Sequence, residues 1–130
     1  MTDLYIPATS DTPEINFKFS SNLLSMSGEA YPENGVEFFR PILRQLQSHL
    51  KSLSGDTVKF DFQLTYFNSV STKIFYSMFE LLNEYAKAHP NCVLLNWHHD
   101  EEDDMILDFG LDIQEDFTWI DFNAIASASA

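Results

Sequence analysis

Basic residues and long hydrophobic runs are scarce in this sequence. Only 7 Lys and Arg stand against 20 Asp and Glu, which gives a formal net charge of -13. Clustered cations supply most of the affinity for nucleic acid, so this charge argues against nucleic acid as a partner. No apolar run approaches the length of about 20 residues that crosses a bilayer, and no basic apolar leader opens the chain. We therefore expect a cytoplasmic protein without membrane insertion.

Cysteine and glycine are scarce as well. The single cysteine, Cys92, cannot form an internal disulfide, and its apolar sequence neighbours indicate a buried thiol rather than a nucleophile. The 4 glycines are isolated, so the sequence has no glycine-rich phosphate-binding loop and no G-x-S-x-G elbow. Nucleotide hydrolysis and serine-hydrolase chemistry therefore find no support, and we expect no cofactor.

Apolar residues, by contrast, are plentiful. They make up 45% of the chain and include 12 Phe, which is enough for one domain with its own core over residues 1–130. We expect residues 1–13 to form an extended arm and residues 124–130 to form a flexible tail. Between them we expect a hairpin at 14–28, a helix at 34–53 and a strand at 58–67 that a second helix follows directly. A strand at 92–97, a third helix that begins within residues 100–104 and a strand at 117–122 complete the order.

This order of elements predicts the fold class. Strand-helix-strand units have right-handed crossovers, so we expect a mixed α/β fold with a partly parallel sheet covered by helices. The apolar run 92–97 predicts a strand with both faces covered. Helical spacing also places Val36 in the apolar stripe of the first helix and Met105 in that of the third.

The most informative stretch lies at residues 66–73, where a strand ends and a helix begins. Side-chain oxygens of Asn68, Ser69 and Ser71 can satisfy the free N–H groups of a first helical turn. A phosphate on Ser69 would also be favoured there, because the helix dipole attracts anions and Lys73 follows about one turn later. The residue types are therefore consistent both with a helix cap and with a phosphorylation site.

The periodicity further predicts which side chains around Ser69 are buried. Tyr66 continues the alternating apolar face of the strand, and Phe75 belongs to the apolar stripe of the following helix. We therefore expect both rings to lie in the core on either side of an exposed Ser69.

A second polar stretch runs from His98 to Asp104. His98 and His99, with the carboxylates that follow, suggest as an alternative a small acid-base or metal-dependent enzyme. Metal ligands are normally brought together from spaced positions, however, and this run is continuous. We favour a solvated turn between strand and helix, with no metal site and no catalytic residue.

Three motifs together carry a resemblance to a known family. They are Leu4-x-Ile6 followed by Thr12-Pro13-x-Ile15, then Ser27-Gly28-x-x-Tyr31-Pro32-Glu33-Asn34, and Leu64-x-Tyr66-x-Asn68-Ser69-x-Ser71 before Lys73. In these motifs, and over nearly its whole length, the chain resembles the SiaC family of regulatory phosphoproteins, relatives in fold of the STAS-domain anti-sigma-factor antagonists. The resemblance implies a STAS-like mixed β-sheet with an N-terminal hairpin and covering α-helices.

The resemblance also implies a function. In that family a SiaB-like kinase phosphorylates the hydroxyl residue after the strand-end Asn, and a SiaA-like PP2C phosphatase removes the phosphate. The unphosphorylated form binds and activates a SiaD-like diguanylate cyclase. This chain would then be a non-enzymatic, partner-switching signalling protein of c-di-GMP pathways that control biofilm formation and aggregation.

The resemblance assigns roles to particular residues. The phosphorylated position corresponds to Ser69, and the next position, a Ser in the family pattern, is Val70 here. Ser71 and Thr72 stay open as minor phosphorylation sites. The surroundings of the phosphosite are Tyr66, Asn68, Ser71 and Lys73, and the partner-binding segment is Tyr31, Pro32, Glu33 and Asn34.

Overall fold

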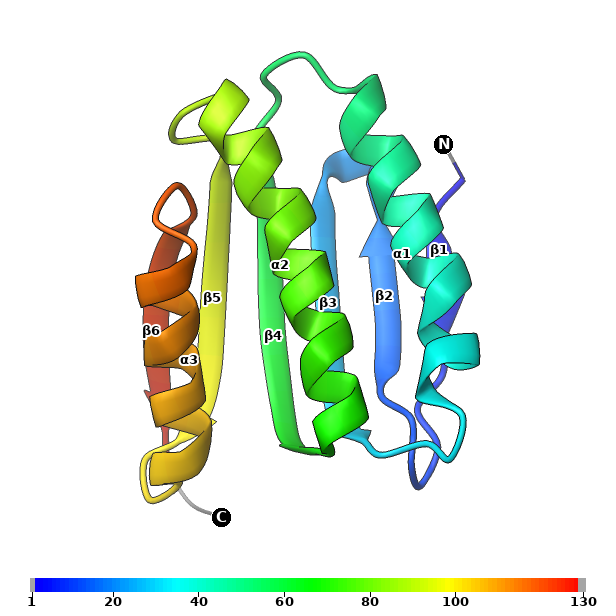
Figure 1. Cartoon of the computed structure of the whole chain (residues 1–130), viewed down its shortest axis with the longest axis vertical. Helices are drawn as coiled ribbons and strands as arrows, with labels where there is room; N and C mark the ends of the chain where they lie inside the picture. Colours follow the sequence, from blue (N-terminus) through cyan, green and yellow to red (C-terminus); the bar gives the residue numbers. More distant parts are fainter. Residues whose placement is uncertain (1, 129–130) are drawn as a thin grey trace.

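The fold is that of a computed structural model in which residues 2–128 are described. Within them, six strands form one sheet, and three α-helices lie together on one face of it (Figure 1). The elements are β1 (Leu4–Ile6), β2 (Glu14–Lys18), the 3-10 turn η1 (Phe19–Ser21), β3 (Leu23–Ala30), α1 (Gly35–Ser52), β4 (Val58–Phe67), α2 (Ser69–Ala88), β5 (Val93–Asp100), α3 (Asp104–Asp116) and β6 (Asp121–Ser127). None of the described helices is long and apolar enough to span a membrane.

The strands follow one another across the sheet in sequence order. β1, β2 and β3 are antiparallel neighbours, whereas β3, β4, β5 and β6 run parallel to one another. Each of the three helices connects a strand to the parallel strand next to it, always in the same direction across the sheet. Because such crossovers are right-handed, α1, α2 and α3 lie on the same face. The predicted mixed α/β sheet with an opening hairpin and covering helices is therefore confirmed, with the helices on one face only.

The core lies between the sheet and the helices and is centred on Phe62 of β4. The ring of Phe62 stacks on Trp97 of β5 with centroids 4.5 Å apart, and it meets Phe75 of α2 edge-on at 5.1 Å. Trp97 is fully buried, and its indole N–H donates to the Ile106 carbonyl of α3 at 2.9 Å. A Cβ at Gly110 would overlap the Trp97 indole, so this glycine lets α3 approach β5 closely.

The C-terminal strand lies further along the chain than predicted. Residues 117–119 form the turn after α3, and β6 begins at Asp121. The predicted flexible tail is wrong for residues 124–127, which pair with β5, while residues 129–130 lie outside the described part. Ala124 and Ala126 stand opposite Trp97 and His99 in the ladder, so these small residues belong to the sheet and do not mark a loose end.

Three further expectations change in the structure. The predicted N-terminal arm contributes β1, which forms the edge of the sheet beside β2. β5 extends to Asp100, so His98 and His99 belong to a strand instead of a solvated turn. Burial alternates along β5, and Leu94 is only half-buried on the face that carries no helix. The prediction that both faces of this strand are covered is therefore wrong.

Candidate functional site

The corner between β4 and α2 is shaped by a bulge. The register between β3 and β4 shifts after Leu64, where Thr65 is an extra residue. One extra residue moves the following side chains to the opposite faces of the strand. Phe67 therefore turns to the core, with its ring 5.4 Å from Phe75, whereas Tyr66 is 53% exposed. The predicted burial of Phe75 is confirmed, and that of Tyr66 is wrong.

The three hydroxyl residues in the first turn of α2 differ in accessibility. The Asn68 side chain caps the helix by accepting from the Ser71 N–H at 3.0 Å. Ser71 is fully buried, and its hydroxyl has no hydrogen-bond partner among the described residues. Thr72 is half-buried and donates to the Asn68 carbonyl at 3.1 Å. Ser69 is exposed. Ser69 is thus the hydroxyl of this turn that another protein can reach.

The segment 31–34 lies beside this corner, because the parallel strands β3 and β4 end at the same edge of the sheet. The Tyr31 ring meets the Tyr66 ring edge-on with centroids 5.7 Å apart. Pro32 is buried, while Glu33 and Asn34 are exposed. Asn34 occupies the N-cap position of α1, as expected, but its side chain makes no capping hydrogen bond. The structure therefore brings together two groups of residues that lie far apart in the sequence.

Exposed apolar side chains gather around Ser69, and we call this set the corner surface. Its members come from the loop after β3, the end of β4 and the first turns of three helices; they are Tyr31, Val36, Tyr66, Val70 and Met105. A Cβ at Gly35 would lie 3.2 Å from the Val70 side chain, so glycine allows the starts of α1 and α2 to touch. Met105 is 84% exposed and lines a cavity of about 320 Å³ next to Tyr66 and Thr72.

Besides Tyr66, two members of the corner surface were not expected to be exposed. Val36 and Met105 fit the spacing of buried helical stripes, yet both are exposed in the first turns of α1 and α3. Helical periodicity identifies which side of a helix is apolar, but it does not show where along the axis the covering layer ends. Their exposure therefore follows from tertiary structure, and the sequence offers no local signal for it.

The acidic stretch lies at the same edge of the sheet, at the start of α3. Asp103 caps this helix, with its carboxylate accepting from the Ile106 N–H at 3.1 Å. Asp104 lies in the first turn, where the helix dipole favours negative charge. Lys73 of α2 is exposed and stands one turn from Ser69. The corner thus combines apolar side chains and acids with one nearby cation.

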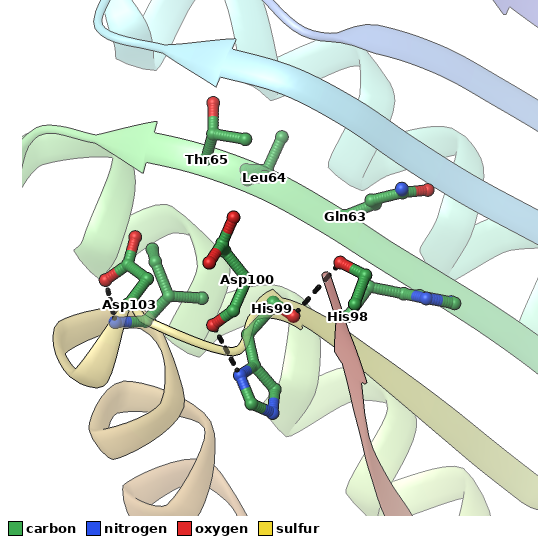
Figure 2. A pocket seen from close by; sticks show the side chains of 9 residues that line it. Gln63, Leu64, Thr65, His98, His99, Asp100 and Asp103 are labelled. Atoms are coloured by element: carbon green, nitrogen blue, oxygen red, sulfur yellow. Dashed lines mark hydrogen bonds between the residues drawn. The ribbon is translucent and has the colours of Figure 1, made fainter. Parts of the chain in front are cut away.

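His98 and His99 point away from each other, because neighbouring residues of a strand alternate in direction (Figure 2). His98 lies on the helix-free face, with its Nε2 3.0 Å from an Asp61 carboxylate oxygen. His99 is buried, and its Nδ1 lies 3.0 Å from the Asp100 carbonyl. Among residues 2–128, no group of three or more His, Cys, Asp or Glu side chains is placed to hold a metal ion. Both histidines line one cavity of about 130 Å³ together with Asp100 and Asp103, but their rings point in different directions.

A mixed sheet with three helices on one face and an accessible serine at the start of a helix defines the class of small two-layer α/β domains. Residues 6–127 match the SiaC family regulatory phosphoproteins, and the chain belongs to this family. The match includes the motifs at residues 27–34 and 64–73, which meet at the corner between β4 and α2.

Related proteins agree in sequence and in structure. A protein of Pseudomonas aeruginosa strain UCBPP-PA14, described as uncharacterized, is 32% identical over 116 residues, which cover 89% of this chain and 90% of that protein. The crystal structure of apo-SiaC from Pseudomonas aeruginosa is 30% identical, with a TM-score of 0.88 over 97% of this chain and 100% of that one. SiaC in the crystal structure of the diguanylate cyclase SiaD in complex with its activator SiaC, from the same species, is also 30% identical. Its TM-score is 0.88 over 96% of this chain and 100% of that chain.

Proposed function

We propose that this protein is a phosphorylation-controlled activator of a diguanylate cyclase. The form with an unmodified Ser69 binds and activates a SiaD-like cyclase, a SiaB-like kinase phosphorylates Ser69, and a SiaA-like PP2C phosphatase reverses the modification. The observation that carries the proposal is that Ser69 is exposed next to Val70 of the apolar corner surface, while Ser71 in the same turn is buried. The similarity to a SiaC bound to its cyclase supports the choice of partner.

Phosphate at Ser69 is compatible with the folded domain. Ser69 is the first residue of α2, where backbone N–H groups are free of intrahelical partners and the dipole favours an anion. Lys73 supplies a positive charge one turn away. Because the Ser69 side chain is exposed, the phosphate would enter water instead of displacing core residues. The modification should therefore act locally and leave the core unchanged.

The same phosphate should prevent a partner from covering the corner surface. Exposed tyrosines such as Tyr31 and Tyr66 are typical anchors of protein interfaces, because a large ring is buried at little entropic cost. A phosphate of about -1.5 to -2 charges beside them must be desolvated or paired when the partner docks. An unpaired buried charge costs several kcal/mol, so binding should weaken strongly.

In this proposal the chain acts without catalysis of its own. Its contribution is a binding surface, and the reaction that forms c-di-GMP takes place in the cyclase. His98 and His99 line one cavity, but their rings point apart and have different hydrogen-bond partners, which gives no reason to prefer the alternative of a small acid-base or metal-dependent enzyme. The expected physiological output is control of biofilm formation and aggregation.

The site of phosphorylation can be tested by intact mass and peptide mapping after incubation with the SiaB-like kinase of the same organism and ATP. Wild-type protein should gain one phosphate at Ser69, Ser69→Ala should gain none, and the matched control Ser71→Ala should be modified like the wild type. Equal phosphate incorporation by wild type and Ser69→Ala would contradict the assignment.

A further inference from the structure

A groove runs between α1 and α2 on the side of the helix layer that faces away from the sheet. It consists of two adjoining cavities of about 380 Å³ and about 360 Å³. Both are lined by Gln47, Leu81 and Glu84, so they form one continuous depression. Along α1 the lining extends from Arg40 to Lys51, which corresponds to about 16 Å or three helical turns.

The two walls of the groove carry opposite charges. Arg40, Arg44 and Lys51 belong to the α1 side, and these are three of the 7 Lys and Arg in the whole chain. Glu80 and Glu84 belong to the α2 side. No ion pair joins the two walls within residues 2–128. These charges are therefore available to a molecule that enters the groove.

The floor of the groove is apolar. Leu43 of α1 and Leu81 of α2 are half-buried and line it between the charged walls. An apolar strip flanked by charged rows is complementary to an amphipathic helix, which presents apolar residues at spacings of three and four between polar flanks. The length of about three turns also suits such a helix.

The groove is aligned with the phosphosite. Ser69, Lys73, Ser77, Glu80 and Glu84 follow one another along α2 at spacings of four, four, three and four, so they share one stripe of the helix. Ser77, Glu80 and Glu84 line the groove, and Ser69 lies on the same stripe at the start of the helix. A helix that occupies the groove and continues toward the open edge of the sheet would therefore reach Ser69.

We propose that this groove binds an amphipathic helix of the diguanylate cyclase, an inference that rests on the function proposed above. Apolar residues of that helix face Leu43 and Leu81. Its acidic flank lies along Arg40 and Arg44, and its basic flank lies along the glutamates of α2. Complementary charges on the two sides fix the orientation of the helix, which directs one of its ends to the phosphosite.

Charge reversal on the α1 wall gives the first test, with the SiaD-like cyclase of the same organism as the probe in titration calorimetry. The double variant Arg40→Glu/Arg44→Glu should bind at least about 30-fold more weakly, because attraction to the acidic flank becomes repulsion. The matched control Lys18→Glu/Lys59→Glu makes the same change in net charge on the helix-free face of the sheet, where both lysines are exposed. The control should stay within about twofold of wild type at moderate salt.

Steric filling of the groove gives a second test that does not depend on charge. Gln47 is exposed and lines both cavities, so Gln47→Trp should obstruct the helix and lower affinity at least about tenfold, whereas Gln47→Ala should not. Near-UV circular dichroism checks that each variant is folded. If the arginine variant does not fold, the Gln47 pair decides the question.

The outcomes separate this inference from the proposed function. If wild-type affinity is retained by the Gln47→Trp variant and by the arginine variant, the groove is not the docking site, while control through Ser69 is unaffected. If unmodified wild-type protein does not bind the cyclase, the proposed function is wrong, and the assignment of the groove fails with it. Loss of binding by both groove variants, with both controls unchanged, is the result we expect.

Discussion

The two ends of the parallel strands use similar side chains in different ways. At the end where β4 begins, which we call the closed end, Tyr85 is 7% exposed and its hydroxyl donates to the Asp56 carbonyl at 2.6 Å. The buried His49 ring there lies 2.6 Å from the Asn22 side-chain oxygen. At the end where β4 finishes, the open end, Tyr66 is 53% exposed and contacts another exposed tyrosine.

The difference separates side chains that stabilise the domain from side chains that a partner can reach. Side chains of the closed end satisfy backbone and loop groups of the domain itself, so they contribute to folding. At the open end, large apolar side chains contact water around Ser69, and five of the nine large hydrophobic residues exposed within residues 2–128 belong to this corner surface. Exposed apolar groups contribute little to folding but are available to a partner.

Truncation of a tyrosine at each end gives the largest expected difference in stability. Tyr85→Ala should lower the free energy of unfolding by about 3–5 kcal/mol, because it removes a buried ring. Tyr66→Ala should lower it by less than about 0.5 kcal/mol, since the ring is exposed, but it should weaken cyclase binding at least about tenfold. Urea denaturation and calorimetry measure the two quantities, and equal stability losses would remove the distinction between the ends.

The closed end should also make stability depend on pH. Burial lowers the pKa of His49 from its ordinary value of about 6.5, although the charge of Asp56 acts in the opposite direction. The unfolded chain then binds the proton more readily, so stability should be full above about pH 7.5 and fall below about pH 6.5, by at most about 1.4 kcal/mol per pH unit. Denaturation at pH 7.5 and pH 5.5 should show a smaller loss for His49→Gln, and an identical loss would contradict the assignment to His49.

Two asparagines at helix N-caps allow a comparison of stability within the open end. Asn68→Ala should cost about 1 kcal/mol, because its side chain accepts the Ser71 N–H. Asn34→Ala should cost less than about 0.5 kcal/mol, since Asn34 makes no capping hydrogen bond. The comparison uses the same substitution at the same helix position, so equal costs in urea denaturation would show that the capping bond is not the cause.

The smallest effect on stability is expected at Ser69 itself. Ser69→Ala should change the free energy of unfolding by less than about 0.5 kcal/mol, because the side chain is exposed. This variant should bind the cyclase like unmodified wild type and should not respond to the kinase. Ser69→Asp should weaken binding only in part, because one carboxylate carries less charge than a phosphate. Affinity of Ser69→Asp equal to that of fully phosphorylated protein would contradict this dependence on charge.

Local patterns predict much of the fold. β4 and α2 could be predicted because their alternating and helical apolar residues lie close together in the sequence, and the Asn68 cap follows from residue type. The bulge at Thr65 depends on pairing with β3, a contact between distant residues, so the exposure of Tyr66 could not be predicted. β6 was misplaced for a similar reason, since its small residues reveal a strand only through their pairing with β5, which is distant in the sequence.

The candidate site could be predicted only in part from the sequence. Ser69 was identified by its residue type after the strand and by resemblance to the SiaC family, and the structure adds the contrast with the buried Ser71. The proposal that residues 31–34 bind a partner came from the family motif, while the contact of Tyr31 with Tyr66 required the parallel pairing of β3 and β4. The groove between α1 and α2 could not be predicted, because it depends on how two helices pack on the sheet.

Titration calorimetry of the SiaD-like cyclase with unmodified and with fully Ser69-phosphorylated protein tests the central claim most directly. We predict that phosphate weakens binding by about a hundredfold, which corresponds to about 2.8 kcal/mol, while the near-UV circular dichroism spectrum stays unchanged. Equal affinities of the two forms would contradict control through Ser69. A loss of affinity accompanied by loss of the near-UV signal would show unfolding and would contradict a local effect at the corner surface.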